Sequence, residues 1–463
     1  MKRKPICGPT FEEMLYPERI DPAVRQRAID AMKEDILDPV NLYNITWKAT
    51  DNRVRYFLVP RELTGVEPNI VLLYSRDFPT GSHKVGATYS VAIEKQLRGE
   101  IRPGEHTLVW PSTGNYGIGG AWVGPRMGYD SLVILPEQMS AERFEKIAYY
   151  GARVIATPGC ESNVKEIYDK CKELVKADPE RVRVLNQFEE MGNYRFHYYV
   201  TGNSVVEAVR ELEEKGIGNG RTAAFVSAMG SAGTIAAGDR LKELFHETRI
   251  VGLEPIQCPT LSYNGYGGHD IQGIGDKHVT WIHNVNNMDA MMCIDDMECK
   301  KGLQLLTDPV GMDYLAGEVG IGETVVQQLS GIVGISGVCN ILGAIKTAKF
   351  YELGKGDNII TIATDSIDRY GSVMKALSDR YGKMDRAKAI SRHEGIFLSA
   401  KLDYIVEGTV ENRKRWHNLK YYTWVEQQGK TVEELNAQRS QEYWIRQQEM
   451  VSELDAMIRA ARK

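Results

Sequence analysis

The 463-residue chain has no apolar run of signal-peptide length and no stretch that could span a bilayer. Its seven cysteines are scattered, odd in number and without a C-x-x-C pair, so neither a disulfide framework nor a redox couple is expected. Metal-ligand clusters, repeats and low-complexity tracts are also missing. A net charge of -5 gives no reason to expect nucleic acid as a partner. These absences favour a cytoplasmic globular protein of two or three domains that acts on a small polar metabolite.

Short apolar runs alternate with helical patterns from about residue 69 to residue 373, which is typical of parallel sheets covered by helices. After Lys84, for example, Tyr89, Ile93 and Leu97 fall on one helical face, and Gly99 stands where a helix would stop. The sequence therefore predicts an α/β fold. The five clearest strands are Ile70–Tyr74, Thr107–Trp110, Leu132–Leu135, Ala223–Ser227 and Ile359–Ala363.

We divide the chain into four parts on this basis. Residues 1–50 read as a helical N-terminal extension, 51–200 as an N-terminal α/β domain, 201–378 as a C-terminal α/β domain and 379–463 as a helical C-terminal extension. No strand is expected in the last part. A capping box at Thr431 and Glu434 predicts a helix running toward Lys463. The aromatic residues of this extension are expected to pack on the core or on a second subunit.

The segment LLYSRDFPTGSHKVGA ends a strand, turns, and places Lys84 at the start of a helix. A lysine buried at the carboxyl edge of a parallel sheet, close to a helix N-terminus, can have a lowered pKa. Such a lysine is suited to forming a Schiff base. Most lysines are solvated surface residues, so this segment alone does not decide the role of Lys84.

The segment LVWPSTGNYGIGGA places a small, polar loop between a strand and a helix. Hydroxyls, an amide and the N–H groups of a helix start make a receptor for a carboxylate. The same residue types also suit any strand-to-helix turn. The candidate loop residues are Ser112, Thr113, Gly114, Asn115 and Tyr116.

The segment AAFVSAMGSAGTIAAG has the form of a phosphate cradle, in which glycines allow close approach and a helix start favours the dianion. Its candidate residues are Gly230, Ser231, Ala232, Gly233 and Thr234. A dinucleotide site is the alternative, since Glu254 ends the next strand at about the distance of a ribose-binding acid. The G-x-x-G spacing differs from G-x-G-x-x-G, so we expect one phosphate.

The four motifs PTGSHK, PSTGNYG, GSAGT and TDSIDRYGS occur in this order along the chain. In this order the sequence resembles the fold-type II pyridoxal phosphate enzymes, the group of cysteine synthase, cystathionine β-synthase, threonine dehydratase and tryptophan synthase β. Connecting segments such as PEQMSAERFEKIAYYGARVIAT, HDIQGIGDKH and VGISGVCN are similar as well. The resemblance covers roughly residues 69–373 and implies two doubly wound parallel-sheet domains with the cofactor between them.

The resemblance implies a role for each motif residue. Lys84 would carry pyridoxal 5'-phosphate as a Schiff base and remove the Cα proton, Asn115 would meet the ring oxygen, and the Gly230–Thr234 loop would hold the phosphate. Ser366 would meet the pyridine nitrogen, with Asp365 as a competing candidate on the opposite face of its strand. The substrate carboxylate would lie on residues 112–116, with Gly273 lining the pocket. The implied assembly is a homodimer.

The resemblance implies β-elimination or β-replacement through an aminoacrylate intermediate, on cysteine, serine, O-acetylserine or an anionic β-substituted analogue. Tyr116 stands where cysteine synthases usually have a small hydroxyl residue, and Asp276, Lys277 and His278 stand where they usually have small or apolar ones. The added charges indicate a polar or anionic β substituent, unless Lys277 and His278 are exposed loop residues. The glutamate that tryptophan synthase β carries just before its substrate loop has no counterpart here, so indole is not expected as a substrate.

Three alternatives remain open at this point. One is a serine/threonine dehydratase, another is a Rossmann-type nucleotide enzyme using Gly230 and Glu254, and the third is a partner-binding protein that uses its charged tail. We interpret His83 and His269 as hydrogen-bonded structural residues rather than further acid-base groups.

Overall fold

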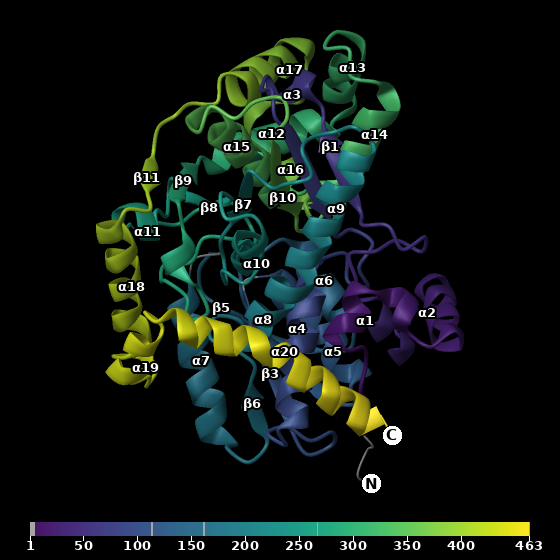
Figure 1. Cartoon of the computed structure of the whole chain (residues 1–463), viewed down its shortest axis with the longest axis vertical. Helices are drawn as coiled ribbons and strands as arrows, with labels where there is room; N and C mark the ends of the chain where they lie inside the picture. The colour runs from purple at the N-terminus through teal and green to yellow at the C-terminus, as the bar shows by residue number, and fades with distance from the viewer. Residues whose placement is uncertain (1–4, 113, 161–162, 266, 463) are drawn as a thin grey trace.

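The computed structural model describes residues 5–112, 114–160, 163–265 and 267–462. Two β-sheets organise this part of the chain, a seven-stranded sheet in the upper half of Figure 1 and a four-stranded sheet in the lower half. The larger sheet has the order β1-β2-β10-β7-β8-β9-β11 and the smaller one β5-β4-β3-β6. The strands are β1 Tyr56–Val59, β2 Asn69–Tyr74, β3 Thr107–Pro111, β4 Asp130–Pro136, β5 Arg153–Thr157, β6 Val182–Val184, β7 Ala224–Ala228, β8 Arg249–Pro255, β9 Ala290–Ile294, β10 Asn358–Ala363 and β11 Ile405–Glu407.

The five central strands of the larger sheet are parallel, and only its edge strands β1 and β11 pair antiparallel. Runs such as NIVLLY in β2 and NIITIA in β10 are apolar on both faces because helices or the other sheet cover both. Alternate residues of β2 enter different cores: Val71 and Leu73 pack with residues of the smaller sheet, whereas Ile70 and Leu72 pack with α15 (Ile335–Phe350). The first core therefore joins the two sheets.

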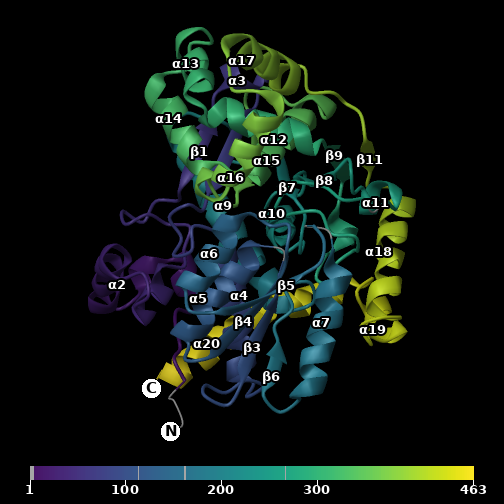
Figure 2. The same ribbon diagram turned by 180° about the vertical axis from the view of Figure 1, so that it is seen from behind.

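Most helices of the first half of the chain surround the smaller sheet and its junction with the larger one, whereas α3 lies at the far end of the larger sheet (Figures 1 and 2). The helix predicted after Lys84 is α4, which buries Tyr89 and Ile93 and ends before Gly99 at a φ of 74°. The helices up to residue 250 are α1 Phe11–Leu15, α2 Pro22–Glu34, α3 Arg61–Thr64, α4 Lys84–Leu97, α5 Asn115–Arg126, α6 Ala141–Tyr149, α7 Val164–Ala177, α8 Met191–Arg195, α9 Gly202–Glu214 and α10 Ala237–Leu244, with shorter 3-10 or π turns at Pro17–Arg19, Pro39–Asn44, Phe196–Thr201 and Thr234–Ala236.

The later helices cover the larger sheet and then return to the smaller one. They are α11 Thr260–Tyr263, α12 Asp296–Thr307, α13 Pro309–Gly317, α14 Glu323–Ile332, α15 Ile335–Phe350, α16 Gly371–Tyr381, α17 Arg386–Arg392, α18 Val410–Trp424, α19 Val432–Ala437 and α20 Gln441–Arg462, with short turns at Val285–Asn287, Ile367–Arg369 and His393–Leu398. No single helix among the described residues is apolar and long enough to cross a membrane; α14 and α15 reach that length together but meet at a bend of 116°.

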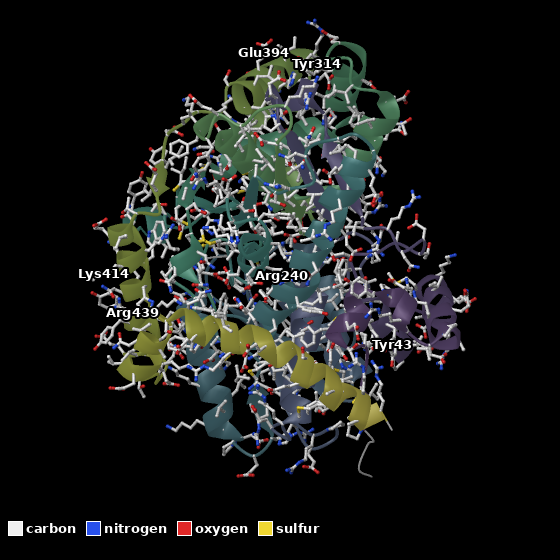
Figure 3. All side chains as sticks on the ribbon, viewed as in Figure 1. Tyr43, Arg240, Tyr314, Glu394, Lys414 and Arg439 are labelled. Carbon is white, nitrogen blue, oxygen red and sulfur yellow. The ribbon has the colours of Figure 1, made fainter. Side chains whose placement is uncertain are left out.

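The C-terminal helix α20 runs across the lower half of the molecule and ends beside the N-terminal segment (Figure 1). Asp455 of α20 accepts hydrogen bonds from the backbone N–H groups of Phe11, at 2.7 Å, and Glu12, at 3.0 Å. Charged side chains such as Lys414 of α18 and Arg439, which follows α19, project outward from one edge of the molecule (Figure 3). The two ends of the chain thus stabilise each other.

The five predicted strands are present, within one or two residues at each end. The division at residues 51–200 does not follow the sheets, because β1 and β2 pair with β10 in the larger sheet. The prediction of a strand-free tail is wrong: β11 pairs with β9 at the sheet edge, where a three-residue strand leaves little alternation to detect. The capping box at Thr431 is confirmed, but its helix α19 ends at Ala437 and α20 is a separate helix.

Candidate active site

Lys84 is the first residue of α4 and follows a loop that leaves the carboxyl end of β2. Its side chain is buried, and its Nζ donates a hydrogen bond to Ser231 Oγ at 3.0 Å. Ser231 lies in the loop after β7, the strand that pairs with β10 in the larger sheet. The fold therefore joins the predicted lysine to the predicted phosphate loop.

The loop at residues 112–116 turns from β3 into α5. Ser112 Oγ accepts hydrogen bonds from the backbone N–H groups of Gly114, at 2.9 Å, and Gly117, at 2.7 Å, which fixes the start of the helix. Tyr116 is buried, and its hydroxyl donates to the carbonyl of Leu185 at 3.2 Å. Thr113 lies outside the described residues.

The loop at residues 230–234 leaves β7 and passes through a 3-10 turn at Thr234–Ala236 before α10 begins at Ala237. Ala232 has a φ of 58°, a left-handed conformation that is costly for a residue with a Cβ and that concentrates at functional sites. Asn193 Nδ2 donates to Ser231 Oγ at 3.0 Å, and Thr280 Oγ1 donates to the Ser231 carbonyl at 2.9 Å. Together with the hydrogen bond from Lys84 Nζ, these two hydrogen bonds fix the position of the loop.

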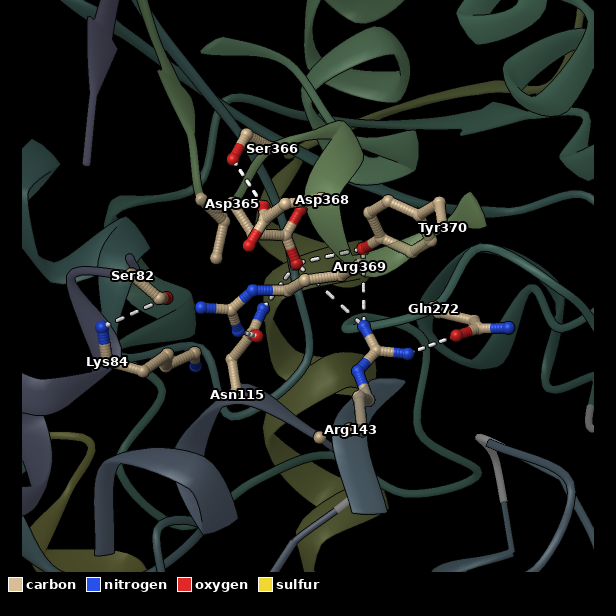
Figure 4. A network of polar contacts seen from close by, with 12 residues as sticks. Ser82, Lys84, Asn115, Arg143, Gln272, Asp365, Ser366, Asp368, Arg369 and Tyr370 are labelled. Carbon is tan, nitrogen blue, oxygen red and sulfur yellow. Dashed lines mark hydrogen bonds and ion pairs between the residues drawn. The ribbon is translucent and has the colours of Figure 1, made fainter. Parts of the chain in front are cut away.

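Asp365 and Ser366, which follow β10, point in different directions (Figure 4). Asp365 Oδ2 accepts hydrogen bonds from Asn115 Nδ2, at 2.6 Å, and Tyr370 OH, at 2.8 Å. Ser366 Oγ instead donates to Asp368 Oδ1 at 2.5 Å. Asp365 is therefore the residue of this pair that contacts Asn115.

Two buried arginines, which sequence reasoning missed, complete the network in Figure 4. Arg143 lies 3.8 Å from Asp365 Oδ2, donates to Tyr370 OH at 3.2 Å and is bonded to Gln272. Arg369 donates to Asn115 Oδ1 and to the Thr80 carbonyl. Both amide atoms of Asn115 are therefore engaged, so the orientation of its side chain is fixed by Asp365 and Arg369.

Most of the predicted site residues line one small cavity, but Ala232, Gly233, Thr234 and Ser366 are not part of its lining. The residues that line this cavity, Lys84 among them, lie in segments that follow strands of both sheets. A second small cavity adjoins the first, and Gly230 and Asp276 line both. The residues that line the first cavity are Lys84, Ser112, Gly114, Asn115, Tyr116, Gln187, Phe188, Gly230, Ser231, Gly273 and Asp276.

Asp276 also lines this cavity. The sequence singled it out for its charge but gave it no definite role. It is buried, and its Oδ2 has no hydrogen-bond partner within the described part of the chain. Burial raises the pKa of its carboxyl to about 7, although the charge of Lys84 acts in the opposite direction.

The neighbouring candidates have structural contacts. Glu254 accepts hydrogen bonds from the backbone N–H groups of Leu261, at 3.0 Å, and Ser262, at 2.7 Å, so it caps α11 and is not placed to bind a ribose. His83 stacks on Trp47, and burial lowers its pKa well below the usual value. His269 Nε2 lies 2.8 Å from the Gly275 carbonyl, and burial lowers its pKa to about 4. Among the described residues no cluster of His, Cys, Asp and Glu could hold a metal ion.

Comparison with known proteins agrees with this arrangement. The sequence profile of the family described as "Pyridoxal-phosphate dependent enzyme" matches residues 64–365. The chain is 31% identical to a cysteine synthase of Staphylococcus aureus over 297 residues, which cover 63% of this chain and 84% of that protein. It is 29% identical to the cystathionine beta-synthase of Saccharomyces cerevisiae over 67% of this chain and 58% of that protein.

The fold is similar to that of isoform 3 of the O-acetyl serine sulfhydrylase from Entamoeba histolytica, with a TM-score of 0.61 at 24% identity over 79% of this chain and 96% of that one. This likeness confirms the predicted fold class. The family match extends from α3 to the end of β10 and so contains Lys84 and the loops around the cavity. The chain belongs to the family of pyridoxal-phosphate dependent enzymes.

Proposed function

We propose that this enzyme catalyses β-elimination or β-replacement on a small L-amino acid with a β leaving group. The observation that carries the proposal is the convergence of Lys84, the Ser112–Tyr116 loop and the Gly230–Thr234 loop on one cavity. The related proteins named cysteine synthase and cystathionine beta-synthase support the same reaction class.

The residues around the cavity fit pyridoxal 5'-phosphate. A Cβ at Gly230 would lie 3.2 Å from the Gly273 carbonyl, so this glycine leaves space that a side chain would fill. Lys84 would hold the cofactor covalently, and Gly230, Ser231, Ala232, Gly233 and Thr234 would hold its phosphate. We assign the ring oxygen to Asn115 and the pyridine nitrogen to Ser366, whose hydroxyl would have to release Asp368 to donate there. When bound, the cofactor supplies an electron sink for the negative charge that develops at Cα.

The substrate carboxylate is assigned to the loop of Ser112, Thr113, Gly114, Asn115 and Tyr116. Helix α5 begins at Asn115, and a helix N-terminus favours an anion. Arg369 and Asp365 orient Asn115 for this task, while Gly273 lines the same cavity. The carboxylate would thus be held on the side of the smaller sheet.

Lys84 is the group we assign to proton transfer at Cα. Its position in the cavity wall, 3.0 Å from Ser231 Oγ, lets the amine remain oriented when it is not bonded to the cofactor. It would take the Cα proton, after which the bond between Cβ and its substituent breaks. The unsaturated amino acid left after this bond breaks would then either add a nucleophile at Cβ or be hydrolysed to a keto acid and ammonia.

His278 has less bearing on the β substituent than the sequence indicated. His278 Nε2 lies 3.1 Å from Tyr168 OH and lines the second cavity, not the one with Lys84. Recognition of an anionic substituent by His278 is therefore not part of the proposal. We keep the homodimer as a proposal, and size-exclusion chromatography tests it against the 52.0 kDa of one chain.

Product analysis on the cofactor-loaded enzyme tests the reaction class. Serine, cysteine, O-acetylserine and threonine are supplied singly, with and without a thiol as nucleophile. A new amino acid with the thiol on Cβ indicates replacement, and pyruvate with ammonia indicates elimination. Preferential formation of 2-oxobutyrate from threonine would instead assign the chain to the serine/threonine dehydratases, and no turnover of any β-substituted amino acid would overturn the proposal.

A further inference from the structure

Asp276 is a carboxyl group that the proposed steps leave without a task. It is only 6% exposed, its Oδ2 lacks a hydrogen-bond partner among the described residues, and it lines the cavity that contains Lys84. Burying an unpaired polar atom is costly, so such an atom facing a cavity points to a ligand that would pair with it.

The fold holds Asp276 in this position from both sides. Gly275 N–H donates to the Met229 carbonyl at 2.8 Å, and Thr280 Oγ1 donates to the Ser231 carbonyl at 2.9 Å, so the Asp276 loop is bonded to the loop after β7. Thr260 Oγ1 donates to the carbonyl of Asp276 itself at 2.8 Å. The carboxyl group is therefore preorganised beside Gly230, where a Cβ would lie 3.7 Å from Asp276 Oδ2.

The position of Asp276 relative to the proposed substrate decides which atom it would meet. The assigned carboxylate loop lies on the side of the smaller sheet, whereas Gly230, Gly273 and Asp276 line the cavity from loops of the larger sheet. A small amino acid with its carboxylate on the first side presents its other groups toward the second. Asp276 also lines the second cavity.

Resting on the proposed function, we propose that Asp276 is the general acid for the departing β substituent, and that the substrate class is an amino acid with a β-hydroxyl or β-thiol. Hydroxide and thiolate are basic leaving groups that need a proton, whereas acetate and chloride do not. Burial keeps part of the carboxyl protonated near neutral pH, since its pKa is raised to about 7.

The step balances without a further reactant. As the Cβ–O or Cβ–S bond breaks, its electron pair leaves with the heteroatom, and the proton of Asp276 joins that atom to give water from a hydroxyl or hydrogen sulfide from a thiol. The electron pair released at Cα, when Lys84 takes the Cα proton, forms the double bond to Cβ. In β-replacement the Asp276 carboxylate takes a proton from the incoming nucleophile and is restored.

The test compares leaving groups in the cofactor-loaded enzyme. Asp276→Asn keeps the shape of the side chain and removes its acid, and Asp313→Asn on the exposed surface of α13 is the matched control. With L-serine or L-cysteine we expect kcat of the Asp276 variant to fall about 100-fold or more. With β-chloro-L-alanine the fall is expected to stay below about 3-fold, and the visible absorption of the bound cofactor is expected to match that of the wild type.

Equal falls with both kinds of leaving group, or no fall with serine and cysteine, would overturn the role of Asp276 and leave the proposed function intact. A wild-type enzyme that binds the cofactor but turns over none of these substrates, β-chloro-L-alanine included, would overturn the proposed function itself. Asp276→Ser is a second variant in case the Asn protein does not fold, and it is judged by the same comparison.

Discussion

Asp276 also predicts a pH dependence of stability at the scale of a single residue. Burial raises its pKa from 3.8 to about 7, so between these pH values the folded chain binds a proton that the unfolded chain has lost. The free energy of unfolding therefore falls as pH rises through this window, by at most ~4 kcal/mol for this group. Asp276→Asn stays neutral and avoids this loss.

We expect the Asp276→Asn protein to gain stability relative to the wild type between pH 5 and pH 8, measured by urea unfolding with the cofactor removed from both proteins. An identical pH dependence for the two proteins would show that Asp276 is ionised throughout and would contradict the raised pKa.

Asp365 is the acidic member of the buried network around Asn115. Its replacement by Asn leaves Arg143 without its partner carboxylate, and breaking a buried pair in this way costs about 3–5 kcal/mol. The matched control is Asp368→Asn, whose ion pair with Lys146 is half exposed and contributes about 0–1 kcal/mol. Chemical unfolding of both variants measures the difference, and equal losses would contradict the network.

The sequence predicts the positions of some site residues but not of others. Asn115 and the Gly230–Thr234 loop come within a few residues of the end of a strand, and Lys84 follows the loop after β2, so the strand pattern locates them near the edge of a sheet. Arg143 and Arg369 have no such signal, because arginine is usually exposed and their partners are more than 100 residues away. Their burial follows only from the tertiary fold.

At the scale of elements, the C-terminal helices are part of the core. Trp424 of α18 is fully buried and donates to the Val279 carbonyl at 2.8 Å, next to the loop that carries Asp276. Lys420 on the same helix is also buried and donates to the carbonyls of Trp281, at 3.1 Å, and His283, at 2.6 Å. These contacts argue against a tail that acts as a separate binding module.

Truncating Trp424 tests this arrangement. Trp424→Ala is expected to destabilise the protein by about 3–5 kcal/mol because it opens a cavity and removes a hydrogen bond. Tyr422→Ala, on the exposed face of the same helix, is expected to cost no more than about 0.5 kcal/mol. Thermal unfolding compares the two, and a fully stable Trp424 variant would mean that α18 is not needed by the core.

Strand existence was predictable where both faces of a strand are buried, as in β2 and β10, because the apolar run is then continuous. The pairing of the strands was not predictable. Residues 69 and 358 are neighbours in the sheet, and no local pattern reports a contact over that separation. For the same reason the sequence could not assign β1 and β2 to the larger sheet, whereas β11 was missed because three residues show too little alternation.

At the scale of the whole molecule, the fold places a cavity where loops from both sheets meet. The resemblance carried by the four motifs implied this arrangement, and the first three motifs contribute residues to the cavity lining. The two ends of the chain were less predictable, yet they pack on the same body through contacts such as Asp455 with Phe11.

The central claim is that Lys84 binds the cofactor, and the visible absorption spectrum of the purified enzyme tests it most directly. The wild type and a Lys375→Ala control, changed at an exposed lysine of α16, are expected to absorb in the visible range and to change their spectra when serine or cysteine is added. Lys84→Ala, incubated with the cofactor and passed over a desalting column, is expected to lose this absorption. A Lys84→Ala protein that keeps the wild-type spectrum and its response to substrate would contradict the account.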